Sequence, residues 1–184
     1  MKTIQTMIIS GYRSFELGIF QEKDPKIKVI KKVIKMSIQQ QLEEGLEWIL
    51  IGGNLGVELW AGEVCLELQK EYPELKLGVL FPFENFGDQW NEKNKQLLTD
   101  IKIRANYVNA TSHAPYQNPS QLKNHTRFLL EHSGGAILIY DEEYPGKTDY
   151  LLKDIRRFSE QTPYFIQQIT MDDLQNIAFD GDSV

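Results

Sequence analysis

The chain has 184 residues, of which 41% are hydrophobic, and a formal net charge of −6 at pH 7. A chain of this length can form one globular domain with a sizeable core, and its dispersed acidic charge argues against a protein that binds nucleic acid through a clustered basic face. Because it has a single cysteine and no apolar run close to the roughly 20 residues that span a bilayer, we expect a soluble cytoplasmic protein without disulfides or a membrane partner.

Short apolar runs alternate along the chain with segments of helical periodicity. Strands are expected at residues 6–10, 48–51, 77–81, 107–108, 136–140 and 164–169, and helices at about 27–42, 57–68, 88–101, 119–132, 148–161 and from 171 onward. Such alternation, with strands apolar on both faces, is typical of right-handed strand–helix–strand units. The sequence therefore predicts an α/β fold with a mostly parallel central sheet flanked by helices on both faces. We expect one domain over residues 1–179, followed by a frayed acidic tail at 180–184.

The residues that follow the expected strands are rich in glycine, hydroxyl and cationic side chains. They are Ser10, Gly11, Tyr12 and Arg13 after the first strand, Gly52, Gly53, Asn54 and Gly56 after the second, Phe83 after the third, and Asp141, Gly146, Lys147 and Thr148 after the fifth. Ligands of open α/β sheets bind beyond the carboxyl ends of the strands, where all these residues would meet. The sequence therefore predicts a ligand-binding site at this edge.

The stretch IGGNLG at residues 51–56 places three glycines between an apolar strand and a helix. There, unpaired backbone N–H groups of the first helical turn and the positive end of the helix dipole would face an anion. A phosphate is the natural occupant, and the alternative is that the glycines serve only tight packing. Arg13 would pair that phosphate through its planar guanidinium, or else be an ordinary loop arginine.

The turn at residues 146–148 offers a second contact to phosphate or ribose, unless Thr148 is only a helix N-cap. Its sequence Gly-Lys-Thr resembles the end of a P-loop. That motif needs a glycine five residues before Gly146, and this position holds Asp141, so no ATPase is predicted.

Two carboxylates, those of Glu58 and Asp141, are the candidate catalytic groups. Glu58 lies in the first turn of the glycine-led helix, where it either complements the helix dipole, holds a ribose hydroxyl or acts as a general acid or base. Asp141 would do the same from across the cleft. Phe83 is one of several aromatic residues near strand ends on which a planar base would stack.

Other catalytic constellations are weak. The three histidines, His113, His125 and His132, lack metal-ligand spacing with nearby cysteines or carboxylates, so no metal is predicted. Trp60 and Cys65 fall on the apolar face of their expected helix and are interpreted as packing residues. No G-x-S-x-G sequence is present, so acyl transfer by a serine is unsupported.

Four segments together resemble the YpsA-like family of small bacterial proteins: SGYRSFELGIF (10–20), GGNLGVELWA (52–61), LFPFE (80–84) and the YD and GKT of residues 140–148. That family is placed in the SLOG superfamily, alongside the LOG-type phosphoribohydrolases and the DprA DNA-processing proteins, all with a Rossmann-like domain. The resemblance covers nearly the full chain. It implies a nucleotide-derived ligand such as ADP-ribose or NAD, a role in cell division or stress signalling in Gram-positive bacteria, and, by analogy, a homo-oligomer.

Carried over onto this chain, the family's glycine-rich site falls on Gly53, Gly56 and Glu58, with Arg13 at the end of the first strand. LOG-type hydrolases carry a P-G-G-x-G-T-x-x-E motif after a late strand, and its glutamate position holds Leu151 here. We therefore expect a sensor or regulator that binds a nucleotide derivative intact. One alternative is an N-glycosidic nucleotide hydrolase. Another is a scaffold that binds a cell-division protein through the polar segment at 109–120, whose length also suits a lid.

Overall fold

Six parallel strands form the central sheet of the computed structural model, which describes residues 3–182. The sheet has the order β4-β3-β2-β1-β5-β6, and each neighbouring pair is parallel. Its strands are β1 (Thr6–Gly11), β2 (Trp48–Ile51), β3 (Lys76–Phe81), β4 (Tyr107–Ala110), β5 (Gly135–Ile139) and β6 (Phe165–Ile169). The expected α/β fold is confirmed, and the described sheet is entirely parallel.

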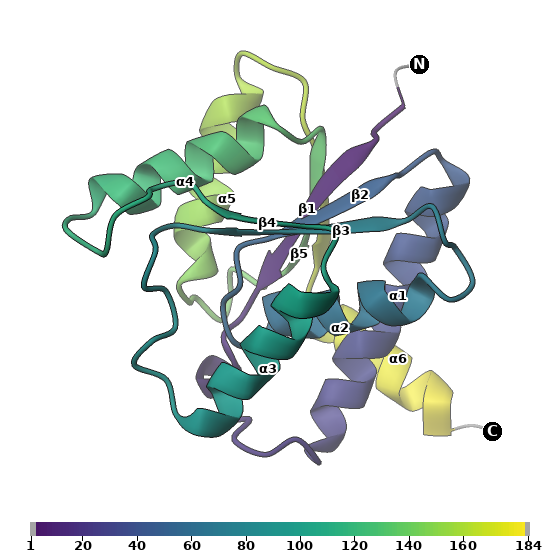
Figure 1. Cartoon of the computed structure of the whole chain (residues 1–184). Helices are drawn as coiled ribbons and strands as arrows, with labels where there is room; N and C mark the ends of the chain where they lie inside the picture. Colours follow the sequence, from purple (N-terminus) through teal and green to yellow (C-terminus); the bar gives the residue numbers. More distant parts are fainter. Residues whose placement is uncertain (1–2, 183–184) are drawn as a thin grey trace.

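The helices form a layer on each face of this sheet (Figure 1). They are α1 (Pro25–Glu43), α2 (Val57–Leu68), α3 (Glu92–Arg104), α4 (Ser120–Glu131), α5 (Thr148–Ser159) and α6 (Met171–Asp182). The chain first runs outward from β1 to β4, so its right-handed crossovers place α1, α2 and α3 on one face. It then returns past β1 to β5 and β6, which places α4 and α5 on the opposite face, while α6 packs beside α1.

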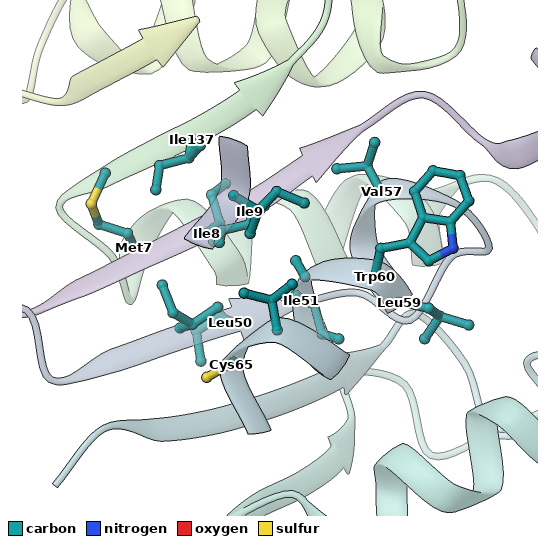
Figure 2. Packing of buried hydrophobic residues seen from close by; sticks show 14 of the residues in the cluster. Met7, Ile8, Ile9, Leu50, Ile51, Val57, Leu59, Trp60, Cys65 and Ile137 are labelled. Carbon is teal, nitrogen blue, oxygen red and sulfur yellow. The ribbon is translucent and has the colours of Figure 1, made fainter. Parts of the chain in front are cut away.

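Strands with apolar side chains on both faces occupy the middle of the sheet, where helices cover both faces. All five residues of β5 and five of the six in β1 are buried, whereas β4, at the edge, buries only Ala110 of its four. Figure 2 shows the packing where α2 covers β1 and β2, with Met7, Ile8, Ile9, Leu50, Ile51, Val57, Leu59, Trp60, Cys65 and Ile137 labelled. Trp60 and Cys65, interpreted as packing residues from the sequence, are 6% and 0% exposed.

Three local predictions differ from the structure. The helix expected at 88–101 begins at Glu92, because Asn91 caps it by accepting a hydrogen bond from the backbone N–H of Asn94 at 2.9 Å. A short 3-10 helix, η1 (Ser14–Leu17), follows β1 and was not expected. The tail expected to fray from residue 180 continues α6 as far as Asp182, and residues 183 and 184 lie outside the described part of the chain.

No helix within residues 3–182 combines the length and the apolar character that crossing a bilayer requires.

The burial of Cys65 generates a first prediction. Desolvation raises the pKa of its thiol to about 12, so almost no thiolate exists at pH 8. Iodoacetamide at pH 8 should leave Cys65 unmodified in the folded protein and alkylate it fully in denaturant, as measured by intact mass. Rapid stoichiometric alkylation of the folded chain would contradict this packing.

Candidate functional site

Successive strands are added on one side of β1 as far as β4 and then on its other side, so the strand order reverses at β1. A groove opens there. Ligands in open α/β sheets bind outside the strand carboxyl ends at such a switch point. The groove has a volume of about 1050 Å³ and runs between α4 and α5. Seven of the residues predicted from the sequence are brought together in its lining, namely Ser10, Arg13, Gly52, Asn54, Glu58, Lys147 and Thr148.

The glycine loop after β2 is pressed against the backbone that follows β1. Gly56 has φ +95°, and a Cβ at this position would lie 2.5 Å from both Tyr12 O and Ser14 N. The backbone N–H of Val57 donates to Tyr12 O at 3.1 Å. Among the hydrogen bonds of residues 3–182, none uses the backbone N–H of Leu55 or Gly56 as donor, so these groups remain available at the start of α2.

Glu58 is buried, at 5% exposed, and anchors this loop from the first turn of α2. Its Oε1 accepts hydrogen bonds from the backbone N–H groups of Gly52 at 2.9 Å and Asn54 at 3.3 Å. Its Oε2 accepts from Ser10 Oγ at 2.9 Å and Asn54 Nδ2 at 3.0 Å. Since a carboxylate offers about four acceptor positions, the protein itself fills those of Glu58.

Arg13 is half-buried and lines the groove together with Lys147 and Thr148, and the part formed by these three residues is called the mouth. Arg13 has no carboxylate partner there. Its Nη1 donates weakly, at 3.3 Å in each case, to Gly11 O and Thr148 Oγ1. None of the ion pairs in the described part of the chain includes Arg13. The remaining donors of its guanidinium are therefore free to pair with an anion.

Glu16 of η1 joins the two walls of the groove mouth, a role that the sequence did not reveal. Its carboxylate accepts hydrogen bonds from the backbone N–H groups of Arg13 at 2.7 Å and Lys147 at 2.9 Å. Gly146 lies directly against this carboxylate, so a Cβ at this position would force the end of the Glu16 side chain to shift. The ammonium of Lys147 lies 5.3 Å from the ring centroid of Phe15.

Tyr12 and Asp141 support the site from behind and are absent from its lining. The Tyr12 hydroxyl donates to Tyr144 O at 2.8 Å and accepts from the backbone N–H of Asp141 at 3.0 Å. The Asp141 carboxylate accepts from the backbone N–H groups of Glu143 and Met171, each at 3.0 Å. Asp141 thus holds the turn after β5 and the start of α6 rather than facing the groove.

Phe83 also lies outside the groove lining, within an aromatic cluster beyond β3. Its ring centroid lies 5.6 Å from that of Phe86 and 5.1 Å from that of Tyr116. Phe86 does line the groove, so the cluster borders the site through that ring. The segment at 109–120 is pinned by Gln121, whose side chain accepts from the backbone N–H of Gln117 and donates to Ser112 Oγ.

His125 is a groove residue that the sequence analysis missed. Its Nε2 lies 2.6 Å from the carbonyl oxygen of Leu80, and a Cβ on Gly52 would lie 3.0 Å from its Cε1. Burial lowers the pKa of His125 below its ordinary value of 6.5, opposed by the Leu80 hydrogen bond and the nearby Glu58 carboxylate. No group of three or more His, Cys, Asp or Glu side chains within residues 3–182 is arranged to hold a metal ion.

Comparison with known proteins gives one consistent family. Residues 7–174 match the model of the YspA SLOG family, YpsA. The chain is 62% identical over 180 residues to the UPF0398 protein of Enterococcus faecalis, covering 98% of this chain and 100% of that protein. It is also similar to the UPF0398 proteins of Leuconostoc citreum and Bacillus pumilus, at 48% and 41% identity, covering 92% and 94% of this chain and 90% and 91% of theirs.

The close approach at Gly56 generates a stability prediction. Gly56→Ala should lower the free energy of unfolding by about 2–4 kcal/mol, since it combines a positive φ with a backbone clash. Gly18→Ala is the matched control, because Gly18 has φ +67° with nothing within 4 Å of its Cβ position, and should cost only about 1 kcal/mol. Urea denaturation measures both, and equal losses would show that the contact between the two loops is unimportant.

The half-buried imidazole of His125 generates a prediction about pH dependence. Because its pKa is lowered on folding, the unfolded chain takes up this proton first as the pH falls below about 6.5, and the free energy of unfolding decreases. His125→Gln removes this titration. Urea denaturation between pH 7.5 and 5.5 should therefore show the stability of the wild type falling relative to that of the variant. Parallel pH profiles would show that His125 titrates alike in both states.

Proposed function

The chain belongs to the YpsA family of SLOG proteins, and we propose that it binds a nucleotide or nucleotide derivative of the ADP-ribose or NAD type in the groove between α4 and α5. The observation that carries this proposal is that Arg13, beside the glycine loop, is half-buried and its guanidinium is not paired with a carboxylate. Unpaired guanidinium and backbone N–H donors at a helix N-terminus suit a phosphate. Lys147 and Thr148 complete the far wall of the mouth.

The charges along the groove support an anionic ligand. Four cations in its lining, Arg13, Lys123, Arg127 and Lys147, take part in none of the ion pairs recorded for residues 3–182. The chain as a whole carries a formal charge of −6, so this concentration of unpaired positive charge is local. Phe86 lines the groove and is held by the rings of Phe81, Phe83 and Trp90, and a base would stack on it.

The carboxylates favour binding over hydrolysis. A general acid or base must bring an oxygen within hydrogen-bond reach of the ligand. Glu58 accepts four hydrogen bonds from the protein, and both oxygens of Asp141 accept from backbone N–H groups outside the groove. A site that binds a ligand without turnover suits a sensor or regulator. We propose that the protein has this role in cell division or stress signalling. It would act as a homo-oligomer or with a cell-division protein as partner.

Calorimetric titration with ADP-ribose, NAD, AMP and ATP tests the binding proposal. At least one of these ligands should bind, and Arg13→Gln should weaken it about tenfold to a hundredfold, because a charge-assisted hydrogen bond contributes about 1.5–3 kcal/mol. Arg104→Gln, at the exposed end of α3 outside the groove, is the matched control and should bind as the wild type does.

The same samples, separated by chromatography after prolonged incubation, should return the ligand intact. Free base in excess of a protein-free control would support the hydrolase instead. Absence of binding by all four ligands would contradict the proposed function.

A further inference from the structure

Two side chains held beside Gly52 carry hydrogen-bond acceptors that the protein leaves open. They are Asn54 and His125, and both line the groove. Glu58, the residue from which the sequence predicted a ribose contact, has both oxygens engaged by Ser10, Gly52 and Asn54. Any recognition of a ligand hydroxyl near Gly52 therefore depends on the neighbours of Glu58.

The orientation of the Asn54 amide is fixed by its partner. The Asn54 side-chain nitrogen Nδ2 lies 3.0 Å from Glu58 Oε2, and an ionised carboxylate only accepts hydrogen bonds. The amide nitrogen must therefore face Glu58, which leaves Oδ1 as an acceptor. None of the hydrogen bonds recorded for residues 3–182 involves Asn54 Oδ1.

The tautomer of His125 is fixed in the same way. The carbonyl oxygen of Leu80 only accepts, so Nε2, at 2.6 Å, carries the hydrogen. In the neutral ring Nδ1 is then an acceptor, and the lowered pKa of His125 keeps the ring neutral near pH 7. Within the described part of the chain no hydrogen bond uses Nδ1.

Both acceptors belong to residues that line the groove. Among residues 3–182 the only enclosed side-chain nitrogen or oxygen without a partner is Gln167 Oε1, so neither Asn54 Oδ1 nor His125 Nδ1 is sealed from solvent. Gly52 packs directly against His125 and Glu58, because a Cβ there would come within 3.0 Å of His125 Cε1 and 2.8 Å of Glu58 Oε1.

We propose that Asn54 Oδ1 and His125 Nδ1 accept hydrogen bonds from the ribose hydroxyls of the bound nucleotide, so that the site selects ribonucleotides over deoxyribonucleotides. This inference rests on the proposed function. Phosphate oxygens accept hydrogen bonds and are suited to the donors of Arg13 and the glycine loop, whereas hydroxyls donate and are suited to these two acceptors. The arrangement therefore sets the direction of the ligand, with phosphate at Arg13 and the adjoining ribose at Asn54 and His125.

Calorimetric titration with ADP, 2′-deoxy-ADP and 3′-deoxy-ADP tests this selection. The wild type should bind at least one deoxy analogue about threefold to tenfold more weakly than ADP, as expected for one lost hydrogen bond. His125→Phe or Asn54→Ala should bind ADP and that analogue equally, within about twofold. His125→Gln, whose amide supplies both a donor for Leu80 and an acceptor, should retain the discrimination. His113→Phe is the matched control, since His113 has a 71% exposed side chain outside the groove.

The outcomes separate the two proposals. If ADP binds and the wild type does not discriminate, or if both His125→Phe and Asn54→Ala still discriminate, the ribose contacts are wrong while nucleotide binding stands. If none of the three nucleotides binds the wild type, this inference is wrong, whereas the proposed function fails only if ADP-ribose, NAD, AMP and ATP do not bind either. Circular dichroism melting confirms that each variant is folded, and because the readout is a ratio between ligands, a general loss of affinity does not imitate the predicted effect.

Discussion

The buried carboxylate of Glu58 is the interaction on which the site depends. Burying an ionised carboxylate costs several kcal/mol unless its oxygens are hydrogen-bonded, and here four donors and the positive end of α2 offset that cost. The donors come from the end of β1 and from the loop after β2. One side chain therefore fixes the relative positions of two strand ends and a helix N-terminus.

The remaining geometry follows from that attachment. Because Glu58 holds the glycine loop, Gly56 packs directly against the backbone around Tyr12. This contact fixes the position of the neighbouring residue Arg13. Glu16 then connects the backbone of Arg13 to that of Lys147, so the wall formed by β1 and η1 is tied to the start of α5. As a result, carboxylates bind the backbone N–H groups of the cationic residues at the mouth and fix the positions of these residues. The positive charges of their side chains stay unpaired. Within the acidic field of the whole chain, such a site would attract an anion only at short range, since charges separated by more than about 8 Å are screened at physiological ionic strength.

Features that depend on a local sequence pattern can be predicted from the sequence, whereas side-chain contacts with residues far along the chain cannot. Alternating apolar runs were enough to place Arg13, the glycine loop and the turn at 146–148 on one edge of a parallel sheet. The role of Glu58 was not accessible, because its partner Ser10 is 48 residues away and only the sheet brings them together. Asp141 looked catalytic at a strand end, yet its carboxylate caps α6, which enters 30 residues later. His125 sits in an ordinary amphipathic pattern, and nothing local marks its bond to Leu80, 45 residues earlier.

The same attachment decides between a binding and a catalytic use of Glu58. To release one oxygen, the protein must leave one buried and one partly buried donor unpaired, at about 1–3 kcal/mol each. A total of about 2–6 kcal/mol means that the carboxylate is free in roughly 3% of molecules or fewer. A ligand that used Glu58 directly would have to replace Ser10, Gly52 or Asn54 as donor in the same place. Asn54 and His125 need no such rearrangement, because their hydrogen bonds to Glu58 and the Leu80 carbonyl already leave each side chain with a free acceptor. In the proposed function, the glutamate thus contributes to ligand recognition through the residues that it holds in place.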